Sequence, residues 1–595
     1  MQTQAPTTRA ALPLILIAAV IQGGALYGLH RAIQTHHWPA THLPWLLGLY
    51  SMTVLVPTTL QLLVEHARRA LLWWLIAILA GALFGFGWHY GEAVAGRSLE
   101  DFNALGDYFY LIGVSCVLWL LSLPFAQSRL QIGRWSTAYR PLFESAWRNA
   151  IALVEAGVFT GSFWLLLLLW QTLFRMLGID FFAQLFVQPA FIYPVTSVVF
   201  GCALHLIGSI DRLVAVVLEQ VLNVLKWLGT VAGLLLALFT LALLVKLPGL
   251  VFEGQRAIGA VWLLWLVAVI VLLLNAAYRD GTDERPYPKW VAQSLRFVVP
   301  LTIVIAATAL YALSVRTQRY GLSVERVWAF VVAIAAFIYS LGYSIAAFRR
   351  GPWLAGIARV NVTVALLLIV TMTAASTPLL SPHRLAANSQ FRRALAAGDN
   401  LSKAGDLTPF VYLRFEAGQY GLERLRELAA LQGQPNAERR ARAAQALKQT
   451  QRWDNRAPPD ISALVARMPV YPAGHTLDPD LTAILAGEWG RSDRGRYGNG
   501  ENGQMAGIFA DLDGDGAEEF IWLNPSLGSI YRHHDGHWQF IGGAFPEGTP
   551  APWESLAAEL AKGALSTQPR RWHDLYLGDH KFRVDIQAGL LGETH

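Results

Sequence analysis

Long apolar stretches occupy most of the first 376 residues of the chain. A helix needs roughly 20 predominantly apolar residues to cross the hydrocarbon core of a bilayer, and eleven segments meet this requirement. They lie at 11–30, 44–64, 70–88, 107–125, 150–174, 191–209, 227–245, 257–276, 297–314, 327–348 and 354–376. The pattern predicts a polytopic all-α membrane domain over residues 1–376, with about 11 transmembrane helices.

Two of these spans leave alternatives open. The 191–209 span follows Pro189 and contains Pro194, and because proline interrupts a helix, a broken or re-entrant helix is the alternative to a full crossing. The first span follows Arg9, as in a signal peptide, but it is longer than a signal core and no A-x-A site closes it. We therefore expect an uncleaved first helix.

The chain changes character after residue 376, where the apolar spans end. Residues 377–460 predict a helical juxtamembrane region that opens at Ser381 and Pro382, a favoured N-cap and first-turn pair. Residues 461–595 predict a small soluble α+β domain, because short segments bounded by Gly, Asn and Asp replace the helical pattern. We expect a β-meander of 505–510, 519–523, 529–533 and 537–542 with a turn at Asp535-Gly536, then a helix near 552–562 and a hairpin around Gly578-Asp579.

Composition and charge predict where the protein is located and how it is oriented in the membrane. Hydrophobic residues make up 54% of the chain and charged residues only 15%, which excludes an ordinary soluble protein. The net charge is +6, and Lys and Arg number fifteen in loops on the N-terminal side of the spans against eight on the other side. The positive-inside rule then predicts a multi-pass protein with a cytoplasmic N-terminus. Eleven crossings put the C-terminal domain outside the cytoplasm, which is the periplasm in a bacterium with two membranes. The basic excess is explained by topology, so we expect the lipid bilayer as a partner and no nucleic acid.

The C-terminal domain contains one sharp motif, DLDGDGAEE. Asp511, Asp513 and Asp515 occupy positions 1, 3 and 5 of a tight loop, Ala517 offers its carbonyl at position 7, and Glu519 stands at position 9. Alternating oxygen ligands of this kind surround Ca²⁺, although Trp522 stands where an EF-hand requires glutamate. The motif resembles the calcium loops of FG-GAP and integrin-like repeats. It predicts a structural Ca²⁺ site, and an empty polar turn rich in Asp and Gly is the alternative.

Polar residues within the spans are the second set of candidates, since charge in lipid is costly and often functional. Glu155, His205 and Arg359 form a possible intramembrane polar site, with Glu155 and His205 as titrating groups and Arg359 as a counter-charge. The alternatives are interfacial snorkelling for Glu155 and Arg359 and an interhelical hydrogen bond for His205. The Gly157/Gly161 pair predicts a helix-packing seam rather than a substrate site.

Several segments carry a family resemblance. They are FIYPVTSVVFG (191–201), LPGLVFEGQ (247–255), NAAYRDG (275–281), RLAANSQFRRAL (384–395) and LTPFVYLRFEAGQYG (407–421). On these segments the chain resembles a family of proteobacterial polytopic inner-membrane proteins that is catalogued only as a domain of unknown function. The resemblance covers most of residues 1–430, outside the acidic loop, and implies a location without an activity.

Two classes of function remain open. The first is a non-enzymatic envelope anchor or sensor with a calcium-stabilised domain outside the cytoplasm, where it binds a periplasmic protein partner. The second is a proton-coupled secondary transporter. An enzyme is less favoured, because no Walker loop, HExxH, GxSxG or CxxC motif occurs in the sequence.

Overall fold

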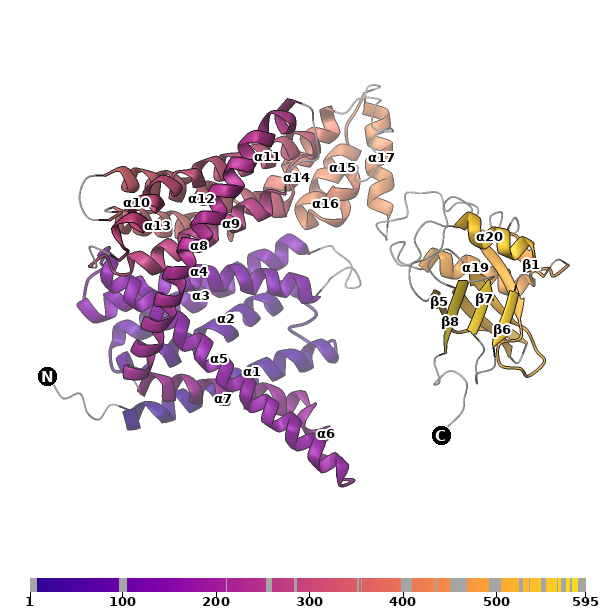
Figure 1. Ribbon diagram of the computed structural model, residues 1–595. Helices are drawn as coiled ribbons and strands as arrows, with labels where there is room; N and C mark the ends of the chain where they lie inside the picture. Colours follow the sequence, from indigo (N-terminus) through magenta and orange to yellow (C-terminus); the bar gives the residue numbers. More distant parts are fainter. Residues whose placement is uncertain are drawn as a thin grey trace. The chain divides into compact units, whose positions relative to one another are not determined.

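The computed structural model describes most of the chain, which divides into two compact units, Met1–Gln449 and Thr450–His595 (Figure 1). The described residues are 8–95, 104–209, 211–252, 259–282, 286–349, 353–354, 356–396, 409–433, 436–449, 468–472, 474–491, 505–523, 528–534, 536–546, 553–563, 565–568, 574–577 and 580–586.

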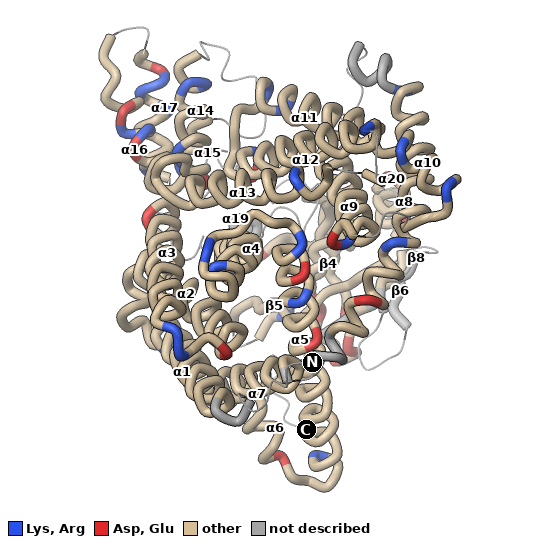
Figure 2. Tube along the Cα trace, turned by 90° about the vertical axis from the view of Figure 1, so that its left-hand side faces the viewer, with Lys and Arg blue, Asp and Glu red and all other residues tan. Residues whose placement is uncertain are grey.

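The first unit is helical, and eleven of its helical segments are long and apolar enough to cross a membrane. Their helices are α1 (Thr8–Gln34), α2 (Leu43–Leu62), α3 (Ala70–Val94), α4 (Ala104–Ile132), α5 (Tyr139–Met176), α7 (Pro189–Ser209), α8 (Asp211–Phe252), α9 (Ala260–Tyr278), α10 and α11 together (Lys289–Val298 and Leu301–Tyr320), α12 (Val324–Phe348) and α13 (Ile357–Ala375). The short helices η1 (Val64–His66) and α6 (Phe181–Phe186) connect them. Charged residues gather at helix ends and turns, as Figure 2 shows. The predicted polytopic bundle is confirmed.

The structure distinguishes the two alternatives left open for the 191–209 span. Helix α7 is unbroken from Pro189 to Ser209, with Pro194 inside it, so the segment is neither broken nor re-entrant. Pro194 is the sixth residue of the helix, so it omits one hydrogen bond, the one that would reach the Ala190 carbonyl, and the helix continues past it.

Glycines permit a close contact between helices α2 and α3. A Cβ atom added at Gly91 would lie 2.5 Å from Pro44 Cα, and one at Gly87 would overlap the Leu47 carbonyl. The Gly87-xxx-Gly91 spacing thus lets the two backbones meet, as small residues do in membrane helix pairs. Gly157 and Gly161 are exposed on α5, with open space around them, so the seam predicted there is wrong.

Four further helices follow in the described part of the first unit, and the first two of them contact the turn between α11 and α12. They are α14 (Pro382–Ala396), α15 (Pro409–Phe415), α16 (Gly418–Ala429) and α17 (Ala437–Lys448). Gln390 Nε2 donates to the carbonyls of Tyr320 and Leu322 at 3.0 and 2.9 Å, and Arg393 Nη1 donates to the Tyr320 carbonyl at 2.6 Å. These side chains therefore satisfy carbonyl groups that the end of α11 leaves without helical partners.

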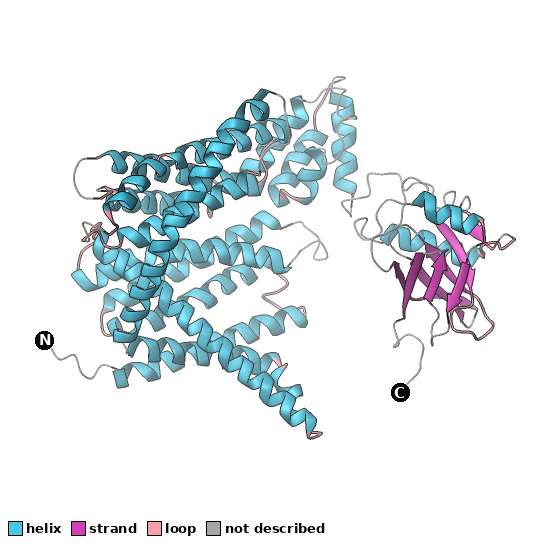
Figure 3. Cartoon of the chain, in the orientation of Figure 1, coloured by secondary structure: helices cyan, strands magenta, loops and turns pink. Residues whose placement is uncertain are grey.

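The described residues of the second unit form an eight-stranded sheet and two helices (Figure 3). Its strands are β1 (Val470–Tyr471), β2 (Ala506–Ala510), β3 (Glu519–Leu523), β4 (Gly528–His534), β5 (His537–Pro546), β6 (Leu565–Gln568), β7 (Asp574–Leu577) and β8 (His580–Ile586), and its helices are α19 (Pro479–Arg491) and α20 (Trp553–Ala561). The strand order is β1-β2-β3-β4-β5-β8-β7-β6, and every pair except β1 with β2 is antiparallel. The predicted meander is present as β2 to β5. Of the predicted turn residues, Asp535, Gly578 and Asp579 lie outside the described part of the chain.

Both faces of this sheet are buried, and alternate residues of each strand point to different cores. Ile508 and Ile521 pack in one core with Leu556 of α20. Phe509 and Phe520 pack in the other core, which contains residues of α19. Along β2 and β3, successive side chains therefore face opposite sides of the sheet. This alternation determines which side each residue faces at the two ends of the β2–β3 connection.

The α2–α3 contact leads to a first prediction. Gly87→Ala should lower the thermal midpoint of the detergent-purified chain, because the added methyl group forces the backbones apart at a cost of about 1–3 kcal/mol. Gly85→Ala, on the same helix with open space around it, is the matched control and should leave the midpoint unchanged or raise it. Tryptophan fluorescence during heating measures both, and equal midpoints for the two variants would contradict the close contact.

Candidate functional site

The acidic loop connects the end of β2 at Ala510 to the start of β3 at Glu519. Asp511 organises it, since its two carboxylate oxygens accept the N–H groups of Gly514 at 2.6 Å and Gly516 at 3.0 Å. Both glycines have positive φ angles, 79° and 88°, which a residue with a side chain rarely adopts. The motif's glycines thus allow the loop to close around the Asp511 carboxylate.

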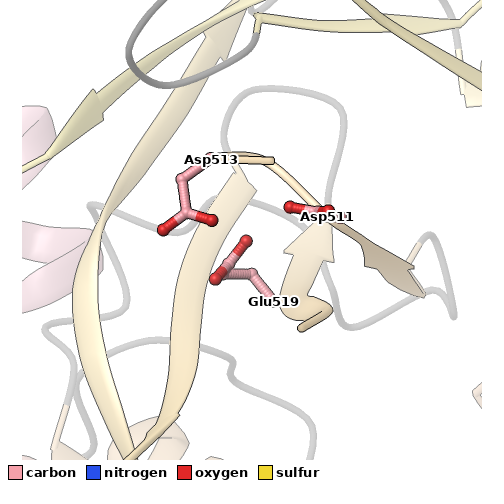
Figure 4. Close-up of side chains that lie close together, drawn as sticks. All are labelled: Asp511, Asp513 and Glu519. Carbon is pink, nitrogen blue, oxygen red and sulfur yellow. The ribbon is translucent and has the colours of Figure 1, made fainter. Parts of the chain in front are cut away.

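Three carboxylates meet inside this loop. Asp511, Asp513 and Glu519 each offer an oxygen within 4.8 Å of the others, and Figure 4 shows their side chains directed toward one space. Glu519 is fully buried, and its Oε2 accepts the Leu512 N–H at 2.9 Å. Its Oε1 is buried without a hydrogen bond, and Arg532 Nε lies 3.8 Å away. The cluster therefore holds an acceptor that no described hydrogen-bond donor satisfies.

The other two predicted ligands lie differently. Asp515 forms an ion pair with Arg532, and its Oδ1 accepts the Ala517 N–H at 2.7 Å. Asp515 is not among the three carboxylates whose oxygens lie within 4.8 Å of one another.

Sequence reasoning missed Arg532. This residue lies on β4, and its guanidinium also reaches Asp513 Oδ2 at 3.3 Å. The register that pairs Phe520 with Tyr531 puts Arg532 beside Glu519. Strand alternation was the available signal, because β3 and β4 were both predicted, but their register was not.

Burial changes the proton affinity of the cluster. Burial raises the pKa of Glu519 to about 7, with the Asp513 charge adding to the effect and the Leu512 N–H and Arg532 opposing it. The pKa of Asp513 is also raised, mainly by burial. A divalent cation would favour the ionised form of both groups and accept the free lone pairs of their oxygens. Hard oxygen donors of this kind fit Ca²⁺.

The three intramembrane candidates do not form one site. His205 lines a polar cavity of about 270 Å³ among α1, α2, α4, α5 and α7, together with Glu65, His66 and Arg148. Glu155 does not line this cavity, and its Oε2 is buried without a hydrogen-bond partner. Arg359 is exposed at the first turn of α13 and pairs with neither residue within the described structure.

The fold and this geometry define a multi-pass membrane protein with a separate C-terminal sheet unit. Comparison with family models identifies a domain of unknown function, DUF4153, over residues 5–406. The match covers more than half of the chain, so the protein belongs to the DUF4153 family. No curated protein and no solved structure matches the chain.

The proton affinity of Glu519 leads to a second prediction, made for calcium-free conditions. Because its pKa is higher in the folded state than the usual 4.5, the stabilisation from this group is complete below pH 4.5 and is lost as the pH rises through about 7. Amide protection factors of β2 and β3, measured by hydrogen exchange in EGTA, should therefore fall over this range. Glu519→Gln, which stays neutral, should remove that slope, and a slope that persists in this variant would assign it to other groups.

Proposed function

We propose that this chain is a non-enzymatic protein of the bacterial inner membrane whose C-terminal unit binds Ca²⁺ outside the cytoplasm. The observation that carries the proposal is the meeting of Asp511, Asp513 and Glu519 within 4.8 Å, around a fully buried glutamate. The bound cation stabilises the β2–β3 connection. The membrane unit then serves as an anchor that holds the C-terminal unit at the membrane surface.

Charge accounting supports a cation in the loop. Asp511, Asp513, Asp515 and Glu519 bring four negative charges when ionised, and Arg532 returns one positive charge. A carboxylate oxygen without a hydrogen bond is costly to bury, and Glu519 is entirely buried with its Oε1 in this state. Ca²⁺ offsets this cost with oxygen coordination at positions that the loop supplies from one short segment. Arg532 on its own leaves most of the charge uncompensated.

The proposed compartment rests on charge and on parity. An odd number of spans puts the two ends of the membrane unit on opposite sides, and the larger number of basic residues lies on the N-terminal side. A cytoplasmic N-terminus therefore puts the second unit in the periplasm. Calcium is more available there than in the cytosol, which suits a site with few carboxylates.

An anchor also explains why the chain is built as two units. The sheet unit has cores of its own on both faces, separate from those of the membrane helices. Such a unit can present a surface to a periplasmic protein partner without any change in the bundle. The transporter alternative has one supporting observation, the polar cavity beside His205. Because Glu155 does not line it and Arg359 lies apart, we favour the anchor.

The calcium site leads to a third prediction. Addition of EGTA to the full chain in detergent should increase hydrogen exchange over residues 511–523, and Ca²⁺ should restore protection, because the cation holds the loop closed. Asp513→Asn should weaken this calcium effect at least roughly tenfold in the Ca²⁺ concentration required, as expected for loss of one charged ligand. The measurement is hydrogen–deuterium exchange with mass spectrometry.

Glu518→Gln is the matched control, since Glu518 is in the same loop but is exposed and pairs with His475 at 2.9 Å. It should respond to calcium as the unsubstituted chain does. Exchange that is insensitive to both EGTA and Ca²⁺ would show that Arg532 alone neutralises the loop, and the calcium proposal would then be abandoned.

The orientation leads to a fourth prediction. Reporter fusions after Gly178 and Asn400 should give active alkaline phosphatase, and a fusion after Arg285 should give fluorescent GFP. These three points follow span five, span eleven and span eight in the proposed orientation. The opposite pattern at all three would reverse the protein in the membrane and put the acidic loop in the cytosol.

A further inference from the structure

Four helix ends meet at a cluster of neutral polar side chains. Asn361 Nδ2 donates to Asn275 Oδ1 at 2.6 Å and to Tyr139 Oη at 3.1 Å. Tyr343 Oη lies 2.5 Å from Asn361 Oδ1 and 2.9 Å from Asn275 Oδ1. These contacts bring together the start of α5, the end of α9, the end of α12 and the start of α13.

This cluster contains more hydrogen-bond donors than its own acceptors use. Asn361 uses both of its N–H groups, and Tyr343 uses its single hydroxyl hydrogen within the cluster. Tyr139 accepts from Asn361, but within the described structure its own O–H has no acceptor. The Asn275 Nδ2 group likewise has no acceptor there, although its Oδ1 is in use. Two neutral donors therefore remain available to a ligand.

Both donors belong to residues that line a cavity of about 350 Å³ between α4, α5, α9, α12 and α13. Away from Tyr139 and Asn275 the lining is mainly apolar, and it includes Leu121, Phe143 and Val362. Two lining residues, Leu120 and Leu272, are 38% and 47% exposed on the outside of membrane-spanning helices. The cavity thus opens on an apolar flank of the bundle, where lipid surrounds it.

The polarity of the cavity lining changes with depth in the membrane, as the polarity of a lipid molecule does from its headgroup to its acyl chains. Asn275 lies three residues before the end of α9, and Asn361 lies four residues after the start of α13, so both are within about 6 Å of a helix end. The apolar lining continues to Ala365 on α13 and Ala150 on α5, about 12 to 16 Å from the same end. The Tyr139 and Asn275 donors therefore stand at the shallow end, and the deep end is apolar except for Tyr339, which lies nine residues before the end of α12.

We propose that this cavity binds a membrane glycerophospholipid. Its acyl chain occupies the deep apolar part, and an ester or phosphate oxygen accepts hydrogen bonds from the Tyr139 hydroxyl and the Asn275 amide. The cavity volume falls within the range of small-molecule sites, which combine apolar walls with a few placed polar groups. Lipid enters sideways from the bilayer, without passing through the bundle.

Native mass spectrometry of the full chain, purified in mild detergent, tests the proposal and is the fifth prediction. The unsubstituted chain should retain one phospholipid. Ala365→Phe fills the cavity and should lower the retained fraction roughly tenfold, whereas Leu367→Phe, exposed on the same helix and outside the lining, should leave it unchanged. If Ala365→Phe does not fold, Ala146→Leu fills the cavity from α5 and serves in its place.

The donor is tested separately. Tyr139→Phe removes the free O–H and should lower retention roughly fivefold, as expected for one hydrogen bond. Tyr278→Phe is its control, because the Tyr278 ring lies 5.9 Å from Tyr139 but does not line the cavity. A phosphatidylethanolamine with a diazirine on its acyl chain should label residues 120–125, 142–150 and 361–365. Absence of bound phospholipid, retention of a quinone in its place, or labelling spread evenly over exposed spans would overturn the proposal.

Discussion

The membrane unit is shaped by one constraint, that no water within the hydrocarbon core can satisfy a backbone N–H or C=O group. Helix interiors meet the constraint by themselves, and helix ends need help. At the end of α11 this help comes from α14, whose Gln390 and Arg393 donate to the carbonyls of Tyr320 and Leu322. The juxtamembrane helices are therefore part of the bundle's hydrogen bonding as well as its continuation in sequence.

The same constraint explains where the bundle gathers its polar side chains. Lipid offers little hydrophobic drive between helices, so α2 and α3 rely on the close backbone approach at Gly87 and Gly91. Polar side chains bond across helices both in helix interiors, as Gln22 of α1 does with Thr58 of α2, and near helix ends, where water and headgroups are within reach. Asn275 and Asn361 lie near helix ends, and Asn361 bonds to residues that stand 86 and 222 positions earlier in the sequence.

The sequence was sufficient for features set by local pattern and insufficient for features set by register. Eleven spans follow from runs of apolar residues, and the β-meander follows from alternation, because both depend on neighbours along the chain. The spacing of Gly157 and Gly161 is the same as that of Gly87 and Gly91, yet only the second pair faces a partner helix. Likewise Asp511, Asp513 and Glu519 could be read from one motif, whereas Arg532 depends on how β4 aligns with β3.

The two candidate sites differ in the kind of polar group that has no hydrogen-bond partner. This difference leads us to propose a different class of ligand for each site. At the acidic loop the surplus group is a buried carboxylate oxygen of Glu519, which calls for positive charge. At the membrane cavity the surplus groups are the neutral donors of Tyr139 and Asn275, which call for an uncharged or delocalised acceptor oxygen. A cation gains nothing from the second site, because its free groups are donors, and a lipid oxygen is repelled by the first. The sign of the unsatisfied group is therefore the physical basis on which the two proposed sites would select different ligands.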